Sequence, residues 1–353
     1  MTRIRLIAPL GIAVLVAFSA TACSPAAQAP DTSKGPAAAG ATPGARATPV
    51  GQLPAAPPTR YTVGCKDLLP ATSIAPLFSH TMAPVDPGEN YRQALYPQLP
   101  QTYFIGQLGG IDCMWSDGHA AAVDGQAAYL SVLPLAAARW KFFLTSENQP
   151  ATATSYVECT PDEGDGANTC HYDALVDGSW LSVGFNEMVP TPGSNPSIMP
   201  GPVKTVVTAV TAALTAAGPP AAPVSPPATS ITLSNTPGAI LTADQVKTAI
   251  GTQGAVGLDC KGIPDGPWSV ANEAEEQVDS SLGCFFTSGS SGGGYGLLYW
   301  LPGGEWAEKR AVAATTSETP LNIPGHHDGD AAAMFVNDQK DHVADLLVGG
   351  NWI

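Results

Sequence analysis

Short apolar runs bounded by Gly and Asp predict β-strands in the first half of the chain. Residues 111–116 and 128–133 are two such β-prone runs, separated by a glycine-rich turn. Residues 171–175 and 180–185 flank Val176-Asp177-Gly178, and Asp and Gly tolerate tight-turn conformations. We therefore expect these last two runs to form a hairpin.

Helical segments are expected before, between and after these strands. Two of these helices are expected at residues 70–78 and around Trp140. Residues 203–217 form the third, and their apolar side chains recur at helical spacing, so this helix can pack on a core. Its expected role is structural. The apolar positions are Val206, Val207, Val210 and Leu214.

The second half of the chain repeats this order of elements. The strand at 111–116 matches the run at 282–287, each centred on a cysteine, and the strand that follows each of them ends in Leu-Pro. A helix starts the second half at 242–250, with Thr242 as its N-cap. The remaining expected elements are a strand at 296–301, a helix around Trp306 and strands at 333–336 and 342–348.

These elements predict an α+β fold with two related modules, each an antiparallel sheet with packed helices. The modules are expected at residues 61–217 and 231–353, joined by the uncharged Pro-rich linker 218–230. Both lengths suit single domains. Because the linker offers few groups for contacts, we expect the modules to fold separately.

The N-terminus has the charge and hydropathy order of a secretory signal, expected at residues 1–22. Arg3 and Arg5 precede an apolar run at 6–18, and small residues lead into Cys23. The run is shorter than the roughly 20 residues that a membrane-spanning helix needs. We expect Cys23 to carry a diacylglycerol and an amide-linked acyl chain, which together exceed the threshold for stable anchoring. Cleavage by the ordinary signal peptidase is the alternative, because Ala20-Thr21-Ala22 also fits its rule.

A tether at residues 23–60 follows, rich in Ala, Pro, Gly, Ser and Thr, and its composition predicts disorder. The formal net charge of the chain is −15. Such a charge disfavours nucleic acid and anionic lipid surfaces as partners. An acidic surface kept for solubility explains it, and capture of cations or basic envelope polymers is the alternative.

Together these features resemble actinobacterial cell-envelope lipoproteins that carry one or two cysteine-stapled α+β modules. The residues that carry the resemblance are the lipobox-like 20–23, the Ala/Pro tether, and the Cys-x-aromatic strands at Cys113-Met114-Trp115 and Cys284-Phe285-Phe286. Position 20 is Ala, where Leu is usual. The resemblance implies a protein of unknown function, or one similar to extracellular sensor and ligand-binding domains. It transfers no catalytic residue.

The seven cysteines leave six after Cys23, and six cysteines allow 15 connectivities. In an oxidising compartment they are expected to pair. Pairing within modules assigns Cys260 to Cys284. The repeat then assigns Cys65 to Cys113 by analogy, although Cys65 and Cys260 lie on opposite sides of the first helix. The remaining expected pair is Cys159 with Cys170.

Three polar segments are candidate sites of chemistry. Ser291 fits the letters of a Gly-x-Ser-x-Gly nucleophile elbow, but the glycine-rich loop around it leads into a strand, whereas an elbow leads into a helix. The loop with His326, His327, Asp328 and Asp330 could ligate zinc, and a solvated loop is the alternative. The loop with Asp162, Glu163 and Asp165 could bind calcium but lacks the EF-hand pattern. Ser-x-x-Lys, the signature of penicillin-recognising enzymes, is absent.

Four aromatic residues could line a ligand groove, and burial in the core is the alternative. These are Trp115, Trp140, Tyr299 and Trp306. The resulting expectation is a lipid-anchored protein on the outer face of the cell membrane that binds an envelope ligand or protein. We expect neither catalysis nor a cofactor or metal. An accessory subunit of an envelope complex and an envelope hydrolase are the alternatives.

Overall fold

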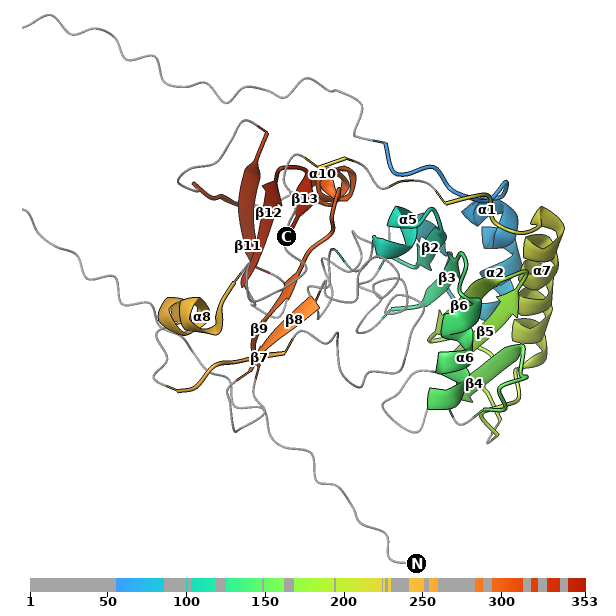
Figure 1. Ribbon diagram of the computed structural model, residues 1–353. Helices are drawn as coiled ribbons and strands as arrows, with labels where there is room; N and C mark the ends of the chain where they lie inside the picture. The colour runs from blue at the N-terminus through green and yellow to red at the C-terminus, as the bar shows by residue number, and fades with distance from the viewer. Residues whose placement is uncertain are drawn as a thin grey trace, which may run out of the picture. The chain divides into compact units, whose positions relative to one another are not determined.

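The structure is a computed structural model (Figure 1). The residues from Gln52 to Ile353 belong to one unit. The predicted signal and most of the predicted tether, including Cys23, lie outside the described residues. The described residues are 55–85, 100, 103–118, 125–147, 149–161, 168–193, 195–223, 225, 228–229, 241–250, 254–259, 283–287, 294–313, 319–322, 329–336 and 342–353.

The first half contains a six-stranded antiparallel sheet of order β1-β2-β3-β6-β5-β4. The α+β class predicted from the sequence is therefore present. Its strands are β1 (Ala83–Val85), β2 (Ile111–Ser116), β3 (Ala127–Leu133), β4 (Ser155–Thr160), β5 (Thr169–Val176) and β6 (Ser179–Asn186). The predicted hairpin joins β5 to β6, and its turn residues Asp177 and Gly178 both have positive φ, 48° and 80°. That turn twists in the same sense as the strands that it joins.

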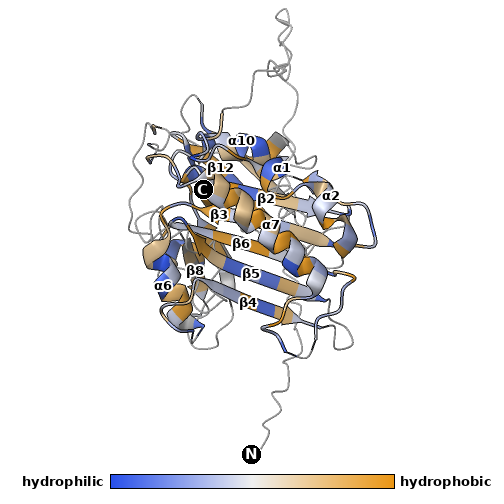
Figure 2. Cartoon of the chain, turned by 90° about the vertical axis from the view of Figure 1, so that its right-hand side faces the viewer, coloured by the Kyte–Doolittle hydropathy of each residue, from blue (hydrophilic) through white to orange (hydrophobic). Residues whose placement is uncertain are grey.

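Alternate residues of this sheet point to a core covered by three helices. In the views of Figures 1 and 2, α1 (Cys65–Leu68), α2 (Ala71–Ile74) and α7 (Gly201–Ala217) lie on the same face of the sheet. The core includes residues such as Val132, Val183 and Val210, each at most 1% exposed. Burial of this apolar face explains why the strands alternate in hydropathy.

The helix predicted at 70–78 is split in two. An α-helical turn, α2, is followed by the 3₁₀ helix η1 (Ala75–Leu77). Pro76 explains the change, because proline has no backbone N–H with which to continue the α-helical hydrogen bonds. The N-cap prediction at Thr242 is confirmed: the Gln245 N–H donates to Thr242 Oγ1 and the Thr242 N–H donates to Gln245 Oε1. These bonds start α8 (Ala243–Ile250).

The second half repeats the order of elements but not the single sheet. The described strands form one sheet of order β7-β8-β9 and another of order β10-β11-β12-β13. In the first half β3 pairs with β6, and the corresponding strands of the second half are β9 and β12. β11 and β13 pair with the two edges of β12, so β9 has no free edge of β12 to pair with. The bounds are β7 (Gly257–Asp259), β8 (Gly283–Thr287), β9 (Gly294–Tyr299), α10 (Glu305–Ala313), β10 (Thr319–Pro320), β11 (Ala331–Val336), β12 (His342–Val348) and β13 (Asn351–Trp352).

One hydrophobic cluster is shared by residues from both sides of the Pro-rich linker. From the first half it includes residues of α5 (Phe104–Gln107) and α6 (Ala137–Ser146). From the second half it includes Trp300, Trp306 and Trp352. Buried residues from both sides of the linker are thus in contact, while the boundaries at 217 and 231 and the separate folding of the two modules stay predictions.

Polar contacts reinforce this shared cluster. The buried Gln107 amide accepts a 2.8 Å hydrogen bond from Trp306 Nε1 and donates a 2.7 Å bond to the Pro302 carbonyl. Near the start of the unit, the buried Arg60 donates through Nε to the Ala221 carbonyl, and the Ala221 N–H donates to the Arg60 carbonyl. The last residue assigned to the tether is thus bound to the linker.

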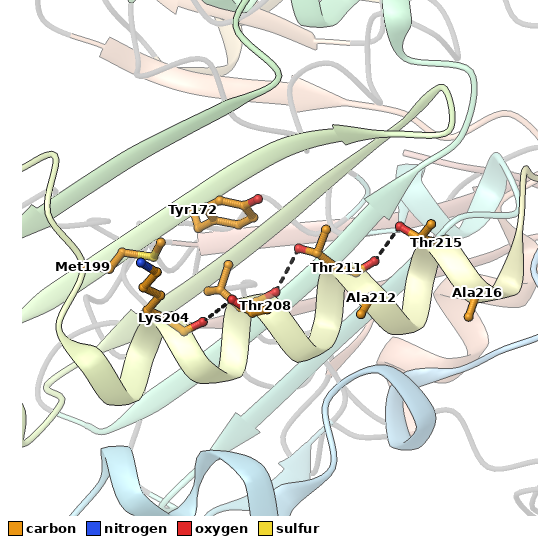
Figure 3. A pocket seen from close by; sticks show the side chains of 9 residues that line it. Tyr172, Met199, Lys204, Thr208, Thr211, Ala212, Thr215 and Ala216 are labelled. Atoms are coloured by element: carbon orange, nitrogen blue, oxygen red, sulfur yellow. Dashed lines mark hydrogen bonds between the residues drawn. The ribbon is translucent and has the colours of Figure 1, made fainter.

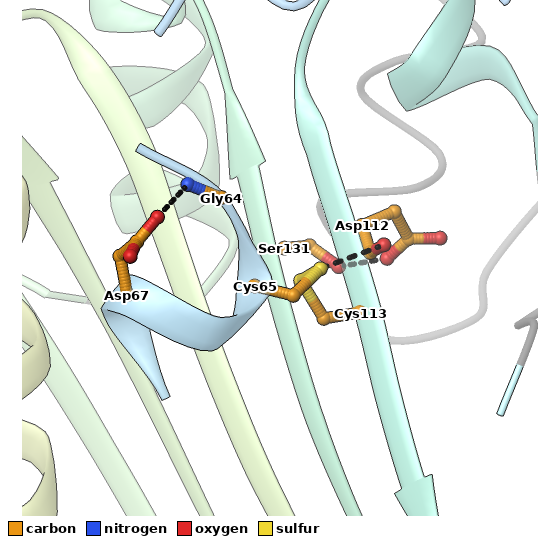
Figure 4. The surroundings of a disulfide bond; sticks show 6 residues. All are labelled: Gly64, Cys65, Asp67, Asp112, Cys113 and Ser131. Carbon is orange, nitrogen blue, oxygen red and sulfur yellow. Dashed lines mark hydrogen bonds between the residues drawn. A yellow bond between two sulfur atoms is a disulfide. The ribbon is translucent and has the colours of Figure 1, made fainter. Parts of the chain in front are cut away.

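Two disulfides fix the first half, and both match the pairing predicted from the sequence. Cys65–Cys113 joins α1 to β2, beside Asp112, which accepts a 2.7 Å hydrogen bond from the Ser131 hydroxyl (Figure 4). Cys159–Cys170 joins facing residues of β4 and β5, with Cα atoms 4.0 Å apart.

Cys284 is also disulfide-bonded. Its predicted partner, Cys260, lies outside the described residues. Among the helices of the described part of the chain, none has the length and apolar character needed to cross a membrane.

Candidate functional site

Most of the candidate catalytic and metal-binding segments lie outside the described residues. These include Ser291, the acidic loop with Asp162, Glu163 and Asp165, and His326, His327 and Asp328. Asp330 is described, and its Oδ1 accepts a 2.9 Å hydrogen bond from the Gly349 N–H. Within the described ranges, no three His, Cys, Asp or Glu side chains cluster as a metal site would require. The zinc and calcium hypotheses therefore stay untested.

The aromatic residues weighed as groove lining are core residues. Trp115, Trp140, Tyr299 and Trp306 are each between 2% and 5% exposed. Trp140 packs edge-on against Trp180, with ring centroids 5.5 Å apart, and Trp306 packs edge-on against Tyr103. Such packing stabilises a core. The remaining candidate sites are the polar face of the sheet and the surface.

A row of polar side chains crosses the sheet on the face opposite α7. Register places Asp112, Ser131, Ser182, Asp173 and Tyr156 side by side on five neighbouring strands. The Asp173 carboxylate is buried and accepts a 2.7 Å hydrogen bond from Trp180 Nε1. Its second oxygen lies 3.0 Å from His171 Nε2. A serine, a histidine and an aspartate thus meet on this face.

Their geometry differs from that of a catalytic triad. His171 Nε2 lies 2.9 Å from Ser182 Oγ and 3.0 Å from Asp173 Oδ2, so both contacts use the same ring nitrogen. A triad needs one imidazole nitrogen for the serine and the other for the carboxylate, because one nitrogen cannot donate to the acid and accept from the hydroxyl at once. Burial lowers the pKa of His171, but Asp173 and then Glu158 outweigh it, and the net pKa is raised. The cluster therefore suits a charged hydrogen-bond network.

A groove of 570 Å³ runs along one flank of α7, beside strand β5 (Figure 3). At 3.6 residues per turn, the buried stripe of α7 and the groove-lining residues fall on adjacent sides of the helix. Val207 belongs to both, and Tyr172 of β5 lines the groove from the sheet. The described lining residues are Tyr172, Met199, Lys204, Val207, Thr208, Thr211, Ala212, Thr215 and Ala216.

The threonines present methyl groups more than hydroxyl groups to a ligand. Thr208, Thr211 and Thr215 each donate their hydroxyl to the carbonyl four residues earlier, at 2.7 to 2.9 Å (Figure 3). These donors are therefore already used by the helix itself. The wall that α7 contributes is mainly apolar, so few of its polar groups lose hydrogen bonds to water when an apolar ligand covers it.

The two ends of the groove differ in charge. Lys204, in the first turn of α7, is exposed and is the only charged residue of this helix. Beside it, Met199 lines the groove, and the neighbouring Ile198 is 60% exposed. The far end, at Thr215 and Ala216, carries no charged lining residue among those described. The groove thus has one cationic end and one apolar end.

The sequence predicted α7 and its buried stripe but not this groove. Helical periodicity shows which residues face a core, and it does not show how far the helix stands from the neighbouring strand. One signal was available: no charge occurs between Thr205 and Ala217, although part of this helix is exposed. The chain has no significant match among protein-family models, curated proteins or solved structures.

Proposed function

We propose that this chain is a lipid-anchored protein of the outer face of the cell membrane that binds an apolar ligand in the groove along α7. The groove is the observation that carries the proposal. Its volume lies in the range of about 300 to 1,000 Å³ usual for small-ligand sites. Its described walls are mainly apolar, with one charged residue at one end.

Binding without catalysis is the better supported form of this function. The Ser182, His171 and Asp173 cluster lacks the two-nitrogen relay of a triad. It also lies on the opposite face of the sheet from the α7 groove. The proposed anchor is the acylated Cys23, which would attach the folded unit to the bilayer through the tether. Nucleic acid is a poor partner because of the net charge of −15.

The test is titration of the full chain with a neutral apolar fluorophore, N-phenyl-1-naphthylamine. Ala212→Trp places a large ring in the groove, and Ala209→Trp is the matched control on an exposed position of α7 outside the lining. We expect Ala212→Trp to weaken binding about tenfold or more, a loss of at least about 1.4 kcal/mol, because the ring occupies space that the ligand would fill. Ala209→Trp should bind as the wild type does. Equal binding by all three proteins would contradict the proposal.

A further inference from the structure

The cationic end of the groove coincides with the positive end of a helix dipole. Lys204 lies in the first turn of the 17-residue helix α7, where the helix itself favours negative charge. A lysine at this position does not help the helix, because cations stabilise the opposite end. Among the described residues, no carboxylate pairs with the Lys204 ammonium group. Both the side chain and the helix end therefore favour an anion here.

The length and volume of the groove suit one extended chain. From Lys204 to Ala216 the helix rises roughly 18 Å, at 1.5 Å per residue. One water molecule takes up roughly 30 Å³ in the liquid. If each non-hydrogen atom of a ligand, with its hydrogens, takes up the same volume, 570 Å³ holds about 19 such atoms. That is enough for a single acyl chain with its head group, and too little for two long chains.

We infer that the α7 groove binds a single-chain anionic amphiphile, with the acyl chain along Thr208 to Ala216 and the anionic head beside Lys204. This inference rests on the proposed function and specifies its ligand. The anionic head also explains why the only charged residue of α7 lies at one end of the groove. Because the chain carries a net charge of −15, a local cation is needed to hold such a head.

The experiment compares dodecanoate with neutral dodecanol as displacers of the fluorophore. Lys204→Gln removes the charge, and Lys141→Gln removes the charge of another exposed lysine, on α6, as a matched control. We expect Lys204→Gln to weaken dodecanoate binding about two- to fivefold, the range of an exposed ion pair of up to about 1 kcal/mol. Dodecanol binding should not change, and Lys141→Gln should change neither.

A series of fatty acids of increasing length tests the placement of the chain. Each added methylene should strengthen binding by up to about fourfold, from about 0.8 kcal/mol per buried methylene, until the chain outgrows the groove. If dodecanol and dodecanoate bind but Lys204→Gln leaves their ratio unchanged, the anionic head is refuted and the groove stands. If neither binds, both proposals fail. If Ala212→Trp instead dissociates a dimer seen by sedimentation, the groove is an interface between two copies.

Discussion

The buried amide of Gln107 offers a sharp perturbation of the contact between the two halves. Gln107→Leu keeps a side chain of similar size but leaves Trp306 Nε1 and the Pro302 carbonyl without their present partner. Each unsatisfied buried group costs about 1 to 3 kcal/mol. Burial of the leucine offsets part of this, about 1.5 kcal/mol or more. We therefore expect a net loss of about 0.5 to 4.5 kcal/mol in the free energy of unfolding.

Urea unfolding measures this loss, with Gln149→Leu as the control. Gln149 is exposed and makes one side-chain hydrogen bond, to the Glu147 carbonyl, so its replacement should change stability by less than about 0.5 kcal/mol. Hydrogen exchange of the backbone amides shows which parts of the chain are destabilised. Peptides from β6 in the first half and from β13 in the second should both lose protection in Gln107→Leu. If the two glutamine variants were equally stable, or if only one half lost protection, the shared cluster would not couple the halves.

Two further predictions concern covalent links. Removing the disulfide between Cys65 and Cys113 should cost about 4 kcal/mol and removing the β4–β5 disulfide about 3 kcal/mol, because the first closes the longer loop, 48 residues against 11. Thermal unfolding of the paired serine variants tests the order, and a larger loss for the shorter loop would contradict it. Cys23→Ala should release the protein from the membrane fraction, because the proposed acyl chains on Cys23 would be its anchor. Fractionation followed by immunoblotting tests this, and an unchanged distribution would disprove the anchor.

The sequence predicted best those helices and strands whose apolar residues recur at one regular spacing and face a single core. Strand β2, the β5–β6 hairpin and α7 were predicted because their apolar positions face a single core. Strand β4 was missed because it is an edge strand with several exposed residues, so its hydropathy alternates weakly. The four residues of α5 are too few to show a helical period.

Local sequence patterns could not predict the contacts between segments that are distant in the chain. The cluster around Trp300, Trp306 and Trp352 depends on residues from both halves, and the Pro-rich composition of the linker suggested the opposite. The α7 groove depends on the space between a helix and a strand, for which Tyr172 and Thr211 give no local signal. The disulfide pairs in the first half could be predicted, because a small number of cysteines can pair in only a small number of ways.

Photo-crosslinking tests most directly where an amphiphile binds. A dodecanoate with a diazirine near the end of its chain would be bound to the full protein, activated by light and located by peptide mass spectrometry. We predict adducts on α7 residues 208–216 and on the β5 peptide that contains Tyr172, with competition by unlabelled dodecanoate. Adducts concentrated on another apolar surface, such as that around the exposed Leu135 and Phe142, would contradict the assignment of the groove as the binding site.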